Sequence, residues 1–488
     1  MPKRDMKPLT RREVCTGIAG SAGAAALGAV APGAAGIVAA LDAGVARTAP
    51  EQRASSGNSG WSSIVVGAGA FGAWTAWNLL RKGERVLLLD AWGPAHARAS
   101  SGGESRVTRT AYGADEVYTR MAWESLAEWR WLSERAGLPV FHQTGVLFFF
   151  PRVEPYVTQS LEVHRRLKLP AEQLDRAAMA KRWPQVNWSG IEIGLYEPQL
   201  GALMARRAVQ TLVAEFVKAG GEYRTAAIIS PESSAAANER PAVGEESAAA
   251  DESRKHDSSP RARRQSGDSL LPAATTPPEK NASLDGLRTL AGDTLHADKY
   301  FFACGSWLPK VFPSLLGNRI FPTRQEVFFF APEAGDTRFQ QPNFPAWADF
   351  NNGDIFYGLP DLESRGFKIA HDKHGPPIDP DSGDRQSSAS ALADVRVFMK
   401  MRFPALASRP LVESRVCQYE NSSNGDLLID RHPTWQSVWL IGAGSGHGFK
   451  HAPAVGRYAA DLATGTLKSV EPRFSLASKA TVERRLVH

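Results

Sequence analysis

The sequence contains the stretch Ile64-Val65-Val66-Gly67-Ala68-Gly69-Ala70-Phe71-Gly72, an apolar run that ends in a Gly-x-Gly-x-x-Gly loop. The run predicts a buried strand, and the residues after the loop predict a helix that ends at Gly83. Gly67 allows the tight turn out of the strand, Gly69 lets the backbone approach a pyrophosphate, and Gly72 lets the helix pack closely on the sheet. The start of the helix would present unpaired N–H groups to phosphates. The stretch therefore predicts a dinucleotide-binding loop.

A second apolar strand, Arg85 to Asp90, ends in an acid at the distance expected for a carboxylate that accepts from a ribose hydroxyl. A lone glycine motif is weak evidence, and its alternative is an ordinary glycine-rich turn. Strand, loop, helix, second strand and terminal acid in one register favour a doubly wound α/β fold over that alternative.

Size and composition bound the class of protein. The chain has 488 residues, of which 43% are hydrophobic and 22% charged, as in an ordinary soluble globular protein with room for two domains. Its net charge of +6 comes from Lys and Arg residues that are scattered rather than gathered in one stripe, so we expect no nucleic-acid partner. The three cysteines, Cys15, Cys304 and Cys417, are too few and too far apart for a metal cluster or a disulfide framework. We therefore expect no metal site.

The first fifty residues differ from the rest in composition. Thr10-Arg11-Arg12 precedes an uncharged, Gly/Ala-rich run over 15–41, followed by small residues through Ala49. This outline is typical of a twin-arginine export signal, so residues 1–50 predict the export machinery as a partner and a periplasmic or extracellular location. The run is long enough to span a bilayer but only weakly apolar, which disfavours a retained anchor. A disordered tail on a cytoplasmic protein would also fit this composition.

Between Ala99 and Arg109 the chain is too rich in small residues to be core, and we expect a loop. Arg106 and Arg109 are three residues apart and would share one side of a helical turn; their alternative is a solvated surface pair. Apolar spacing then predicts a helix over 116–136, a buried strand over 145–150, an amphipathic helix over 201–220 and a strand over 222–225.

Residues 231–285 change abruptly to Ser, Ala, Pro, Glu and Arg with almost no aromatic or branched side chains. Such a segment cannot bury enough surface to order itself, so we predict a disordered insertion. Beyond it, residues 299–307 predict a buried strand ending at a glycine, in which Cys304 is most simply a small core residue. Short apolar strands at 326–330, 354–359 and 367–370 predict a strand-rich second domain.

A second strand-to-glycine loop lies near the end of the chain, over Val438-Trp439-Leu440-Ile441-Gly442-Ala443-Gly444-Ser445-Gly446-His447-Gly448-Phe449-Lys450. It precedes a last helix that runs through Leu462. A loop of this kind would bring backbone N–H groups and Lys450 back to the cofactor.

These features together resemble the flavin-dependent amino-acid oxidase family that includes monomeric sarcosine oxidase and N-methyltryptophan oxidase. The resemblance covers nearly everything from Ser62 to about Leu476, apart from the insertion. It rests on the dinucleotide loop, the two arginines, Cys417, Thr144-Gly145-Val146-Leu147, Ile429-Asp430-Arg431-His432-Pro433 and Gly446-His447-Gly448-Phe449-Lys450. It implies an α/β protein with a doubly wound, Rossmann-like FAD-binding domain and a strand-rich α+β substrate domain.

The expected organisation follows from the order of these segments. After the signal over 1–50, the FAD-binding domain is assembled from 61–115, 201–230, 286–310 and 411–475. The substrate domain is assembled from 116–200 and 311–410, and the disordered insertion occupies 231–285.

The resemblance also implies how FAD is held. The flavin would be joined through its 8α-methyl group to the sulfur of Cys417, a reaction that needs a thiolate. The alternatives for this residue are a structural cysteine and a disulfide with Cys304. Arg106 would lie by the flavin ring as a catalytic residue. The expected cofactor-binding residues are Gly67, Gly69, Gly72, Asp90, Ser105, Arg106, Cys417, Gly446, Gly448 and Lys450.

For the substrate, Arg109 and Lys450 match the pair that grips a carboxylate through charge-assisted hydrogen bonds. Lys368 matches the catalytic lysine that promotes reaction of reduced flavin with oxygen, where a fixed cation would stabilise developing negative charge. Spacing alone would make Lys368 a surface strand residue. Tyr357 and Tyr419 match aromatic walls of the substrate pocket, although spacing alone would make them core.

Two positions depart from the family pattern. Asp372 stands between His371 and His374, where the family often has a histidine shortly after the active-site lysine, so we expect Asp372 in the substrate pocket. This difference disfavours sarcosine itself as the substrate. Ser101 and Gly102 stand where one or two histidines commonly precede the next loop glycine, which bears on flavin attachment or on the surroundings of the ring.

The resemblance implies an oxidase of secondary amines, namely N-methyl or N-alkyl amino acids. It would yield an imine, which hydrolyses to an aldehyde and an amine, together with hydrogen peroxide. The expected partners are a small-molecule amine or amino-acid substrate and molecular oxygen, and the protein is expected to be a monomer. The alternatives are a dehydrogenase that passes electrons to a quinone or carrier, and a flavin-binding protein without turnover.

Overall fold

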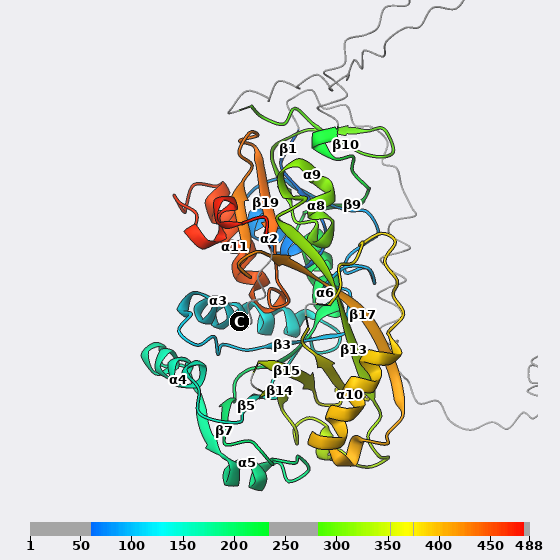
Figure 1. Ribbon diagram of the computed structural model, residues 1–488. Coiled ribbons are helices and arrows are strands. Elements are labelled where there is room, and N and C mark those ends of the chain that lie inside the picture. Colours follow the sequence, from blue (N-terminus) through cyan, green and yellow to red (C-terminus); the bar gives the residue numbers. More distant parts are fainter. Residues whose placement is uncertain (1–59, 234–281, 352, 374, 483–488) are drawn as a thin grey trace, which may run out of the picture. The chain divides into compact units, whose positions relative to one another are not determined.

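The computed structural model describes residues 60–233, 282–351, 353–373 and 375–482, all within the unit Asn58–His488 (Figure 1). The predicted signal over 1–50, Cys15, His374 and residues 234–281 of the predicted insertion lie outside the described residues. No helix in the described ranges is long and apolar enough to cross a membrane.

One sheet has six strands, and its strand β1 (Trp61–Val66) leads into the glycine loop. β1 pairs in parallel with β2 and β12, which pair in parallel with β9 and β19; β18 runs antiparallel at one edge. The order across the sheet is β18 (Leu428–Arg431), β19 (Val438–Gly442), β12 (Ala297–Phe302), β1, β2 (Val86–Asp90) and β9 (Glu222–Thr225). This arrangement confirms the predicted doubly wound sheet.

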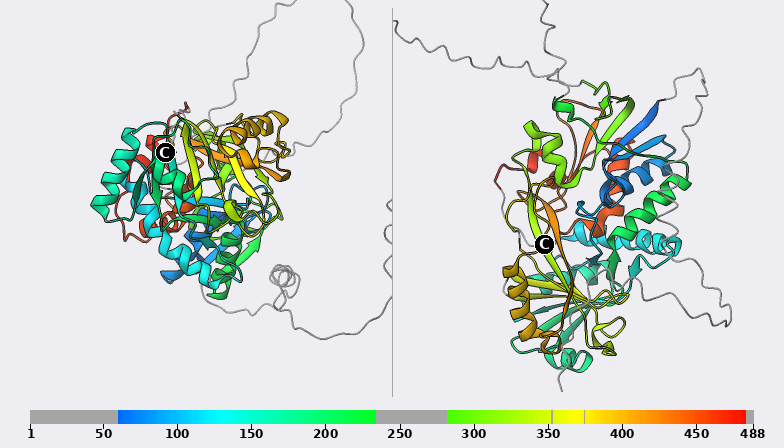
Figure 2. Two further views of the ribbon diagram at one scale, coloured as in Figure 1. Left: turned by 90° about the horizontal axis from the view of Figure 1, so that it is seen from below. Right: turned by 90° about the vertical axis from the view of Figure 1, so that its right-hand side faces the viewer.

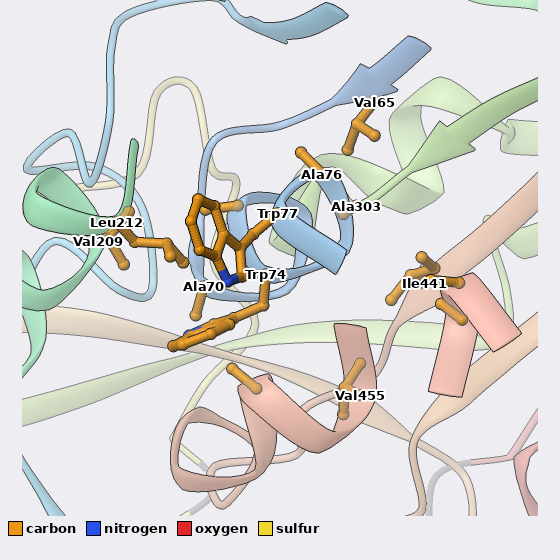
Figure 3. Packing of buried hydrophobic residues seen from close by; sticks show 14 of the residues in the cluster. Val65, Ala70, Trp74, Ala76, Trp77, Val209, Leu212, Ala303, Ile441 and Val455 are labelled. Atoms are coloured by element: carbon orange, nitrogen blue, oxygen red, sulfur yellow. The ribbon is translucent and has the colours of Figure 1, made fainter. Parts of the chain in front are cut away.

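Four helices contribute side chains to the core on one face of this sheet: α2 (Ala70–Arg81), α3 (Glu116–Arg135), α6 (Ala205–Lys218) and α11 (Ala452–Ala463). Figure 3 shows Trp74 and Trp77 of α2 close to Val209 and Leu212 of α6. Trp74 also meets Trp129 of α3 edge-to-face, with 5.4 Å between ring centroids. The blue α2 and the orange-red α11, far apart in sequence, lie side by side (Figure 2). This packing fixes α2, and with it the glycine loop.

The opposite face of the sheet is buried as well. Ile64 and Val66 of β1 pack there with Leu308, Phe312 and Leu316, which come from the short helices α8 (Leu308–Val311) and α9 (Pro313–Leu316) and the residue between them. Burial on both faces explains why the strands read as continuous apolar runs.

The second large sheet has eight strands. β13 and β17 pair antiparallel along their length, and Figure 1 shows the green and the orange strand running together. Helix α10 (Ala389–Arg402) packs on one face through Val395, Phe398 and Met399. The order is β17 (Leu411–Ser422), β13 (Ile320–Phe330), β16 (Phe367–His371), β15 (Asp354–Leu359), β14 (Ala346–Asn351), β5 (Val146–Phe150), β7 (Ile193–Glu197) and β6 (Glu172–Asp175).

The remaining elements are short. A three-stranded sheet has the order β3 (Ser105–Thr108), β8 (Gly201–Met204) and β4 (Phe141–His142), and β10 (Leu287–Arg288) pairs with β11 (Thr294–Leu295). Helices α4 (Pro155–Leu167) and α5 (Arg176–Arg182) lie in the segment before β7.

The short strands correct two predictions. Arg106 lies in β3, whose backbone pairs with β8, so Arg106 and Arg109 do not share a helical turn. The helix predicted over 201–220 begins only at Ala205, because residues 201–204 form β8. Ala, Leu and Met are good helix formers, so apolar spacing did not separate this strand from the helix behind it.

Two segments, β17 and α3, each lie with a different sheet from the one that the sequence predicted. β17 pairs with β13, which places residues 411–422 in the eight-stranded sheet, whereas the sequence predicted an FAD-binding segment from 411. Helix α3, within the predicted substrate segment 116–200, packs with α2 and α11. Local spacing predicted helix α3 but not its packing partners, because packing is set by distant residues.

Candidate active site

The glycine loop after β1 forms part of one wall of a cavity of about 490 Å³. Gly67 has a φ of +102°, and a Cβ there would lie 2.4 Å from the Ala303 carbonyl oxygen. A Cβ at Gly72 would lie 1.8 Å from the Gly67 carbonyl oxygen. Neither position admits a side chain, which agrees with the tight turn and close packing predicted from the motif. Gly69 itself lines the cavity.

Asp90 lies at the end of β2 and also lines this cavity. Its Oδ2 accepts from the Ala68 N–H at 2.8 Å, and its Oδ1 accepts from the N–H groups of Trp92 and Gly93, both at 2.9 Å. The carboxylate therefore ties the loop after β1 to the loop after β2, a role that the sequence did not reveal, while remaining at the cavity wall.

The lining of this cavity holds buried polar atoms with no hydrogen-bond partner among the described residues. They are Ser100 Oγ, Ser306 Oγ, Gln418 Nε2 and Glu420 Oε1. Buried polar atoms are nearly always paired, so several unpaired ones on residues that line a cavity fit a polar ligand. A dinucleotide, with its phosphates and hydroxyls, fits both this donor and acceptor set and the glycine loop. We therefore call this space the dinucleotide cavity.

A second cavity of about 350 Å³ adjoins the first, and we call it the substrate cavity. Arg106, Cys417, Tyr419, Gly446 and Phe449 line both cavities. A group bound at this junction would be accessible from both cavities. The charged side chains of the substrate cavity are mainly cationic: Arg98, Arg106, Arg109, Lys368, Arg385, Arg415 and Lys450, against Glu104 and Asp372.

Cys417 lies on β17 at the junction. Its Sγ is 3.5 Å from Nη2 of Arg106 and 3.6 Å from the Ser100 carbonyl oxygen. Cys304 and Cys417 are both free thiols, so the alternative of a disulfide between them is wrong. Burial raises the pKa of Cys304 far above its ordinary value, and Asp90 and Glu420 add to the rise.

Lys368 lies on β16 with 3% of its surface exposed, so the surface position that spacing alone suggested is wrong. Its Nζ donates to the Ser105 carbonyl oxygen at 2.8 Å, and Arg106 Nη1 donates to the same oxygen at 2.7 Å. Burial, and then the charge of Arg106, lower the pKa of Lys368 to about 7. Ser105 lines neither cavity; its carbonyl holds the two cations together.

Arg109 and Lys450 meet at one side of the substrate cavity. The Arg109 guanidinium stacks 3.9 Å above the ring of Tyr112, and Lys450 Nζ donates to the Tyr112 hydroxyl at 2.9 Å and to the His447 carbonyl oxygen at 2.7 Å. Burial, reinforced by Arg109, lowers the pKa of Lys450 well below its ordinary value. The pKa of Arg109 is raised although burial opposes it, because Tyr112 and nearby acids outweigh burial. Lys450 lines the substrate cavity but not the dinucleotide cavity.

Asp372, just beyond β16, brings a negative charge to this mainly cationic cavity. Asp372 lines the substrate cavity, and its Oδ1 accepts from the Tyr419 hydroxyl at 3.0 Å. Tyr357 lines the same cavity, and burial raises its pKa, as does the charge of Asp372. Gly446 lies beneath Tyr419, where a Cβ would be 2.7 Å from the ring. Gly448 lines the dinucleotide cavity.

His371, next to Asp372 in the sequence, contacts two other carboxylates. Its Nδ1 and Nε2 each lie 2.5 Å from a carboxylate oxygen, of Asp394 and Asp354 respectively. Among the described residues, no group of three or more His, Cys, Asp or Glu side chains could hold a metal ion.

Sequence reasoning missed several lining residues. Val327 and Phe329 alternate along β13 and form an apolar wall of the substrate cavity, a pattern that strand periodicity could have shown. Tyr112, which joins Arg109 to Lys450, and Glu420 carry no local signal, because their roles depend on contacts with distant segments.

The chain is similar to known proteins over most of its length. The chain is 28% identical over 427 residues to monomeric sarcosine oxidase from Bacillus sp. (strain B-0618), covering 86% of this chain and 96% of that protein. It is also 28% identical over 405 residues to N-methyl-L-tryptophan oxidase from Citrobacter koseri, covering 82% and 94%. The structure of L-proline dehydrogenase from P. horikoshii superposes with a TM-score of 0.65 at 17% identity, covering 86% of this chain and 97% of that one.

The model of the family described as "FAD dependent oxidoreductase" matches residues 62–252 and 273–462, which is most of the chain. These ranges span the glycine loop, Arg106, Arg109, Cys417 and the C-terminal glycine loop. The dinucleotide cavity accordingly fits FAD. The chain belongs to the FAD-dependent oxidoreductase family.

Proposed function

We propose that this protein oxidises N-alkyl amino acids at the carbon–nitrogen bond and produces hydrogen peroxide. The observation that carries the proposal is the pairing of Arg109 and Lys450 on Tyr112, inside a mainly cationic cavity that meets the dinucleotide cavity at Arg106 and Cys417. The relatives support it, since those that match over most of the chain are named as oxidases of sarcosine and N-methyl-L-tryptophan.

The carboxylate of the substrate would lie between Arg109 and Lys450. Burial disfavours the ammonium form of Lys450, and Arg109 disfavours it further. A carboxylate placed beside it reverses that effect, because an opposite charge stabilises the protonated amine. Binding of an anionic substrate thus draws a proton onto Lys450 and gives two charge-assisted contacts that fix the orientation of the substrate.

The amine end would face Asp372. An amino acid carries an anionic and a cationic group, and the cavity offers cations at Arg109 and Lys450 and an anion at Asp372. The hydrogen bond from the Tyr419 hydroxyl keeps the Asp372 carboxylate in place at the wall. A carboxylate in this position suits an ammonium partner, and Val327 and Phe329 leave an apolar side for alkyl groups.

FAD, when bound, takes a hydride equivalent from the carbon beside nitrogen and passes two electrons to oxygen, so the amine becomes an imine that water hydrolyses and oxygen becomes hydrogen peroxide. Lys368 and Arg106, held by the Ser105 carbonyl, supply fixed positive charge at the junction of the cavities. Such preorganised charge stabilises negative charge that develops on oxygen. Cys417 is the residue that we propose joins the flavin covalently.

The test is anaerobic mixing of the holoprotein with a panel of amines while the visible flavin absorbance is followed. N-methyl amino acids of increasing side-chain size should bleach it, whereas methylamines without a carboxylate should bleach it far more slowly. Readmitting air should restore the colour with one peroxide per substrate oxidised. No bleaching by any amine would leave a flavin-binding protein, and bleaching without peroxide would leave a dehydrogenase.

We also propose that residues 1–50 direct export by a twin-arginine route, on the basis of their sequence alone. Replacing Arg11 and Arg12 by lysine should leave flavin content unchanged but retain the protein in the cytoplasm of a bacterial host. Equal distribution of both forms between cytoplasm and periplasm would exclude this signal.

A further inference from the structure

One buried carboxyl group in the wall of the dinucleotide cavity has no part in the chemistry above. Glu420 lies on β17 with 6% of its surface exposed, and its Oε1 has no hydrogen-bond partner in the described ranges. Gln418 lies two residues earlier and so on the same face of the strand. It is 1% exposed, and its Nε2 also has no hydrogen-bond partner in the described ranges. Both residues line the cavity. Two neighbouring polar atoms of this kind indicate a ligand that completes their hydrogen bonds.

The surroundings of Glu420 favour a neutral carboxyl group. Glu420 forms no ion pair with any described residue. It lies against the backbone of the C-terminal glycine loop, where a Cβ at Gly442 would be 2.4 Å from Oε1. Burial raises the pKa of Glu420 to about 8, although the N–H groups of Ala443 and Gly444 favour the ionised form. Oε1, which has no hydrogen-bond partner in the described ranges, is the oxygen on which the acid form would carry its proton.

The place of this group in the fold points to its ligand. A Cβ at Gly444 would be 3.6 Å from the ring of Phe71, which lies in the first turn of α2. Glu420 and Asp90 are both close enough to Cys304 to raise the pKa of its thiol. Cys304 in turn lies next to Gly67. Glu420 is therefore at the end of the sheet where the glycine loop and the helix N-terminus bind phosphates. An ionised carboxylate would repel a phosphate, whereas a carboxylic acid donates a hydrogen bond to it.

We propose that Glu420 binds FAD as a carboxylic acid, donating a hydrogen bond from Oε1 to an oxygen of the phosphate–ribityl part of the cofactor, with Gln418 as a second donor from the same strand face. The inference concerns the cofactor and is independent of the proposed substrate. FAD binding then requires one proton on Glu420. Above the pKa of about 8 that proton must be taken up from solvent, so affinity falls with rising pH.

The test uses the full chain carrying Cys417→Ser, so that FAD exchanges freely, and follows quenching of FAD fluorescence between pH 6.5 and 9.5. The dissociation constant should be flat to about pH 8 and then rise by up to tenfold per pH unit. With Glu420→Gln added, which cannot ionise, it should stay flat throughout. Calorimetry in two buffers of different ionisation enthalpy should show uptake of a proton above pH 8 in the first protein and none in the second.

The glutamine variant separates Glu420 from its neighbours. The other titratable groups that line this cavity in the Cys417→Ser protein all remain in Glu420→Gln; they are Asp90, His96, Cys304, Asp381 and Tyr419. A pH dependence that persists in Glu420→Gln would therefore assign the proton to one of them and overturn the proposal, as would a flat profile in the Cys417→Ser protein. Should Glu420→Gln fail to fold, Glu420→Met, which cannot ionise either, takes its place in both measurements. None of these measurements uses turnover, so they stand apart from the test of amine oxidation.

Discussion

Lys368 is the residue whose buried charge has the clearest consequence in solution. Its pKa of about 7 means that it carries its proton below pH 7 and loses it as pH rises through that value. A cation assists transfer of electrons to oxygen, so reoxidation of the reduced flavin should be fastest below pH 7 and slow above it. Lys368→Met should reoxidise about a hundredfold more slowly, equivalent to roughly 3 kcal/mol, with no step near pH 7.

Stopped-flow mixing of reduced protein with oxygen at several pH values measures this, and Arg457→Met, which removes a surface charge paired with Glu124, serves as the control. Reduction by substrate should change much less than reoxidation. If both half-reactions slow equally in Lys368→Met, Lys368 acts on the fold or the flavin rather than on oxygen.

Cys417 lies at the junction of the two cavities with Arg106 Nη2 at 3.5 Å from its sulfur. A thiol beside a fixed cation is suited to react as a thiolate, and we predict that it holds the flavin covalently. Acid-precipitated protein should stay yellow, and Cys417→Ser should release all of its colour into the supernatant. Cys304→Ser should keep its flavin. Colour that washes out of the unaltered protein would show that the flavin is bound without a covalent link.

At the scale of the element, β17 joins the two halves of the site. Its Cys417 and Tyr419 line both cavities, while Gln418 and Glu420 line the dinucleotide cavity alone. The strand runs along β13 in the eight-stranded sheet, and it also contacts the C-terminal glycine loop, where the Ser445 N–H donates to the Glu420 carbonyl oxygen at 2.9 Å. One continuous strand therefore sets the distance between the flavin and substrate walls.

Some elements could be predicted from the sequence, and others could not. The strand before the glycine loop, the strand that ends at Asp90 and the strand at 354–359 were predicted correctly because their signals are local: turn chemistry, strand length and apolar spacing. The placement of Arg106 failed because a four-residue strand pairs with a segment almost a hundred residues away. The contacts of Tyr112 and Glu420 were not predicted, for the same reason. Contacts between distant segments leave no local pattern in the sequence.

At the scale of the whole molecule, the segment 234–281 should be dispensable. Its composition cannot bury enough surface to contribute to folding, and shortening a long loop changes closure entropy by only about 1 kcal/mol or less. The flanking chain is already held together, since Ile228 pairs with Thr289 and Gln436 N–H donates to the Ala282 carbonyl at 2.9 Å.

Replacing 234–281 by a short glycine–serine linker should leave the melting temperature and the flavin content nearly unchanged. A control deletion that also removes Ala282 and Leu284, which pack beside Trp435, should lower the melting temperature. Loss of bound flavin on removing 234–281 alone would show that the segment takes part in the fold.

We propose that Arg109 and Lys450 hold the carboxylate of an amino-acid substrate beside the flavin. Each charge-assisted hydrogen bond is worth roughly 1.5–3 kcal/mol, so losing either partner should weaken substrate binding about ten- to a hundredfold. The two losses should not add, because both residues share Tyr112 and removing one disturbs the other. An amide of the same substrate, which lacks the charge, should bind poorly to the unaltered protein and respond little to either substitution.

The most direct measurement is therefore the rate of anaerobic flavin reduction against substrate concentration for Arg109→Met, Lys450→Met and the double variant, with an N-methyl amino acid and its amide. We predict a large, non-additive loss of affinity for the acid and almost none for the amide. Equal sensitivity of the acid and the amide to these substitutions would contradict the account, because the two residues would then not read the carboxylate.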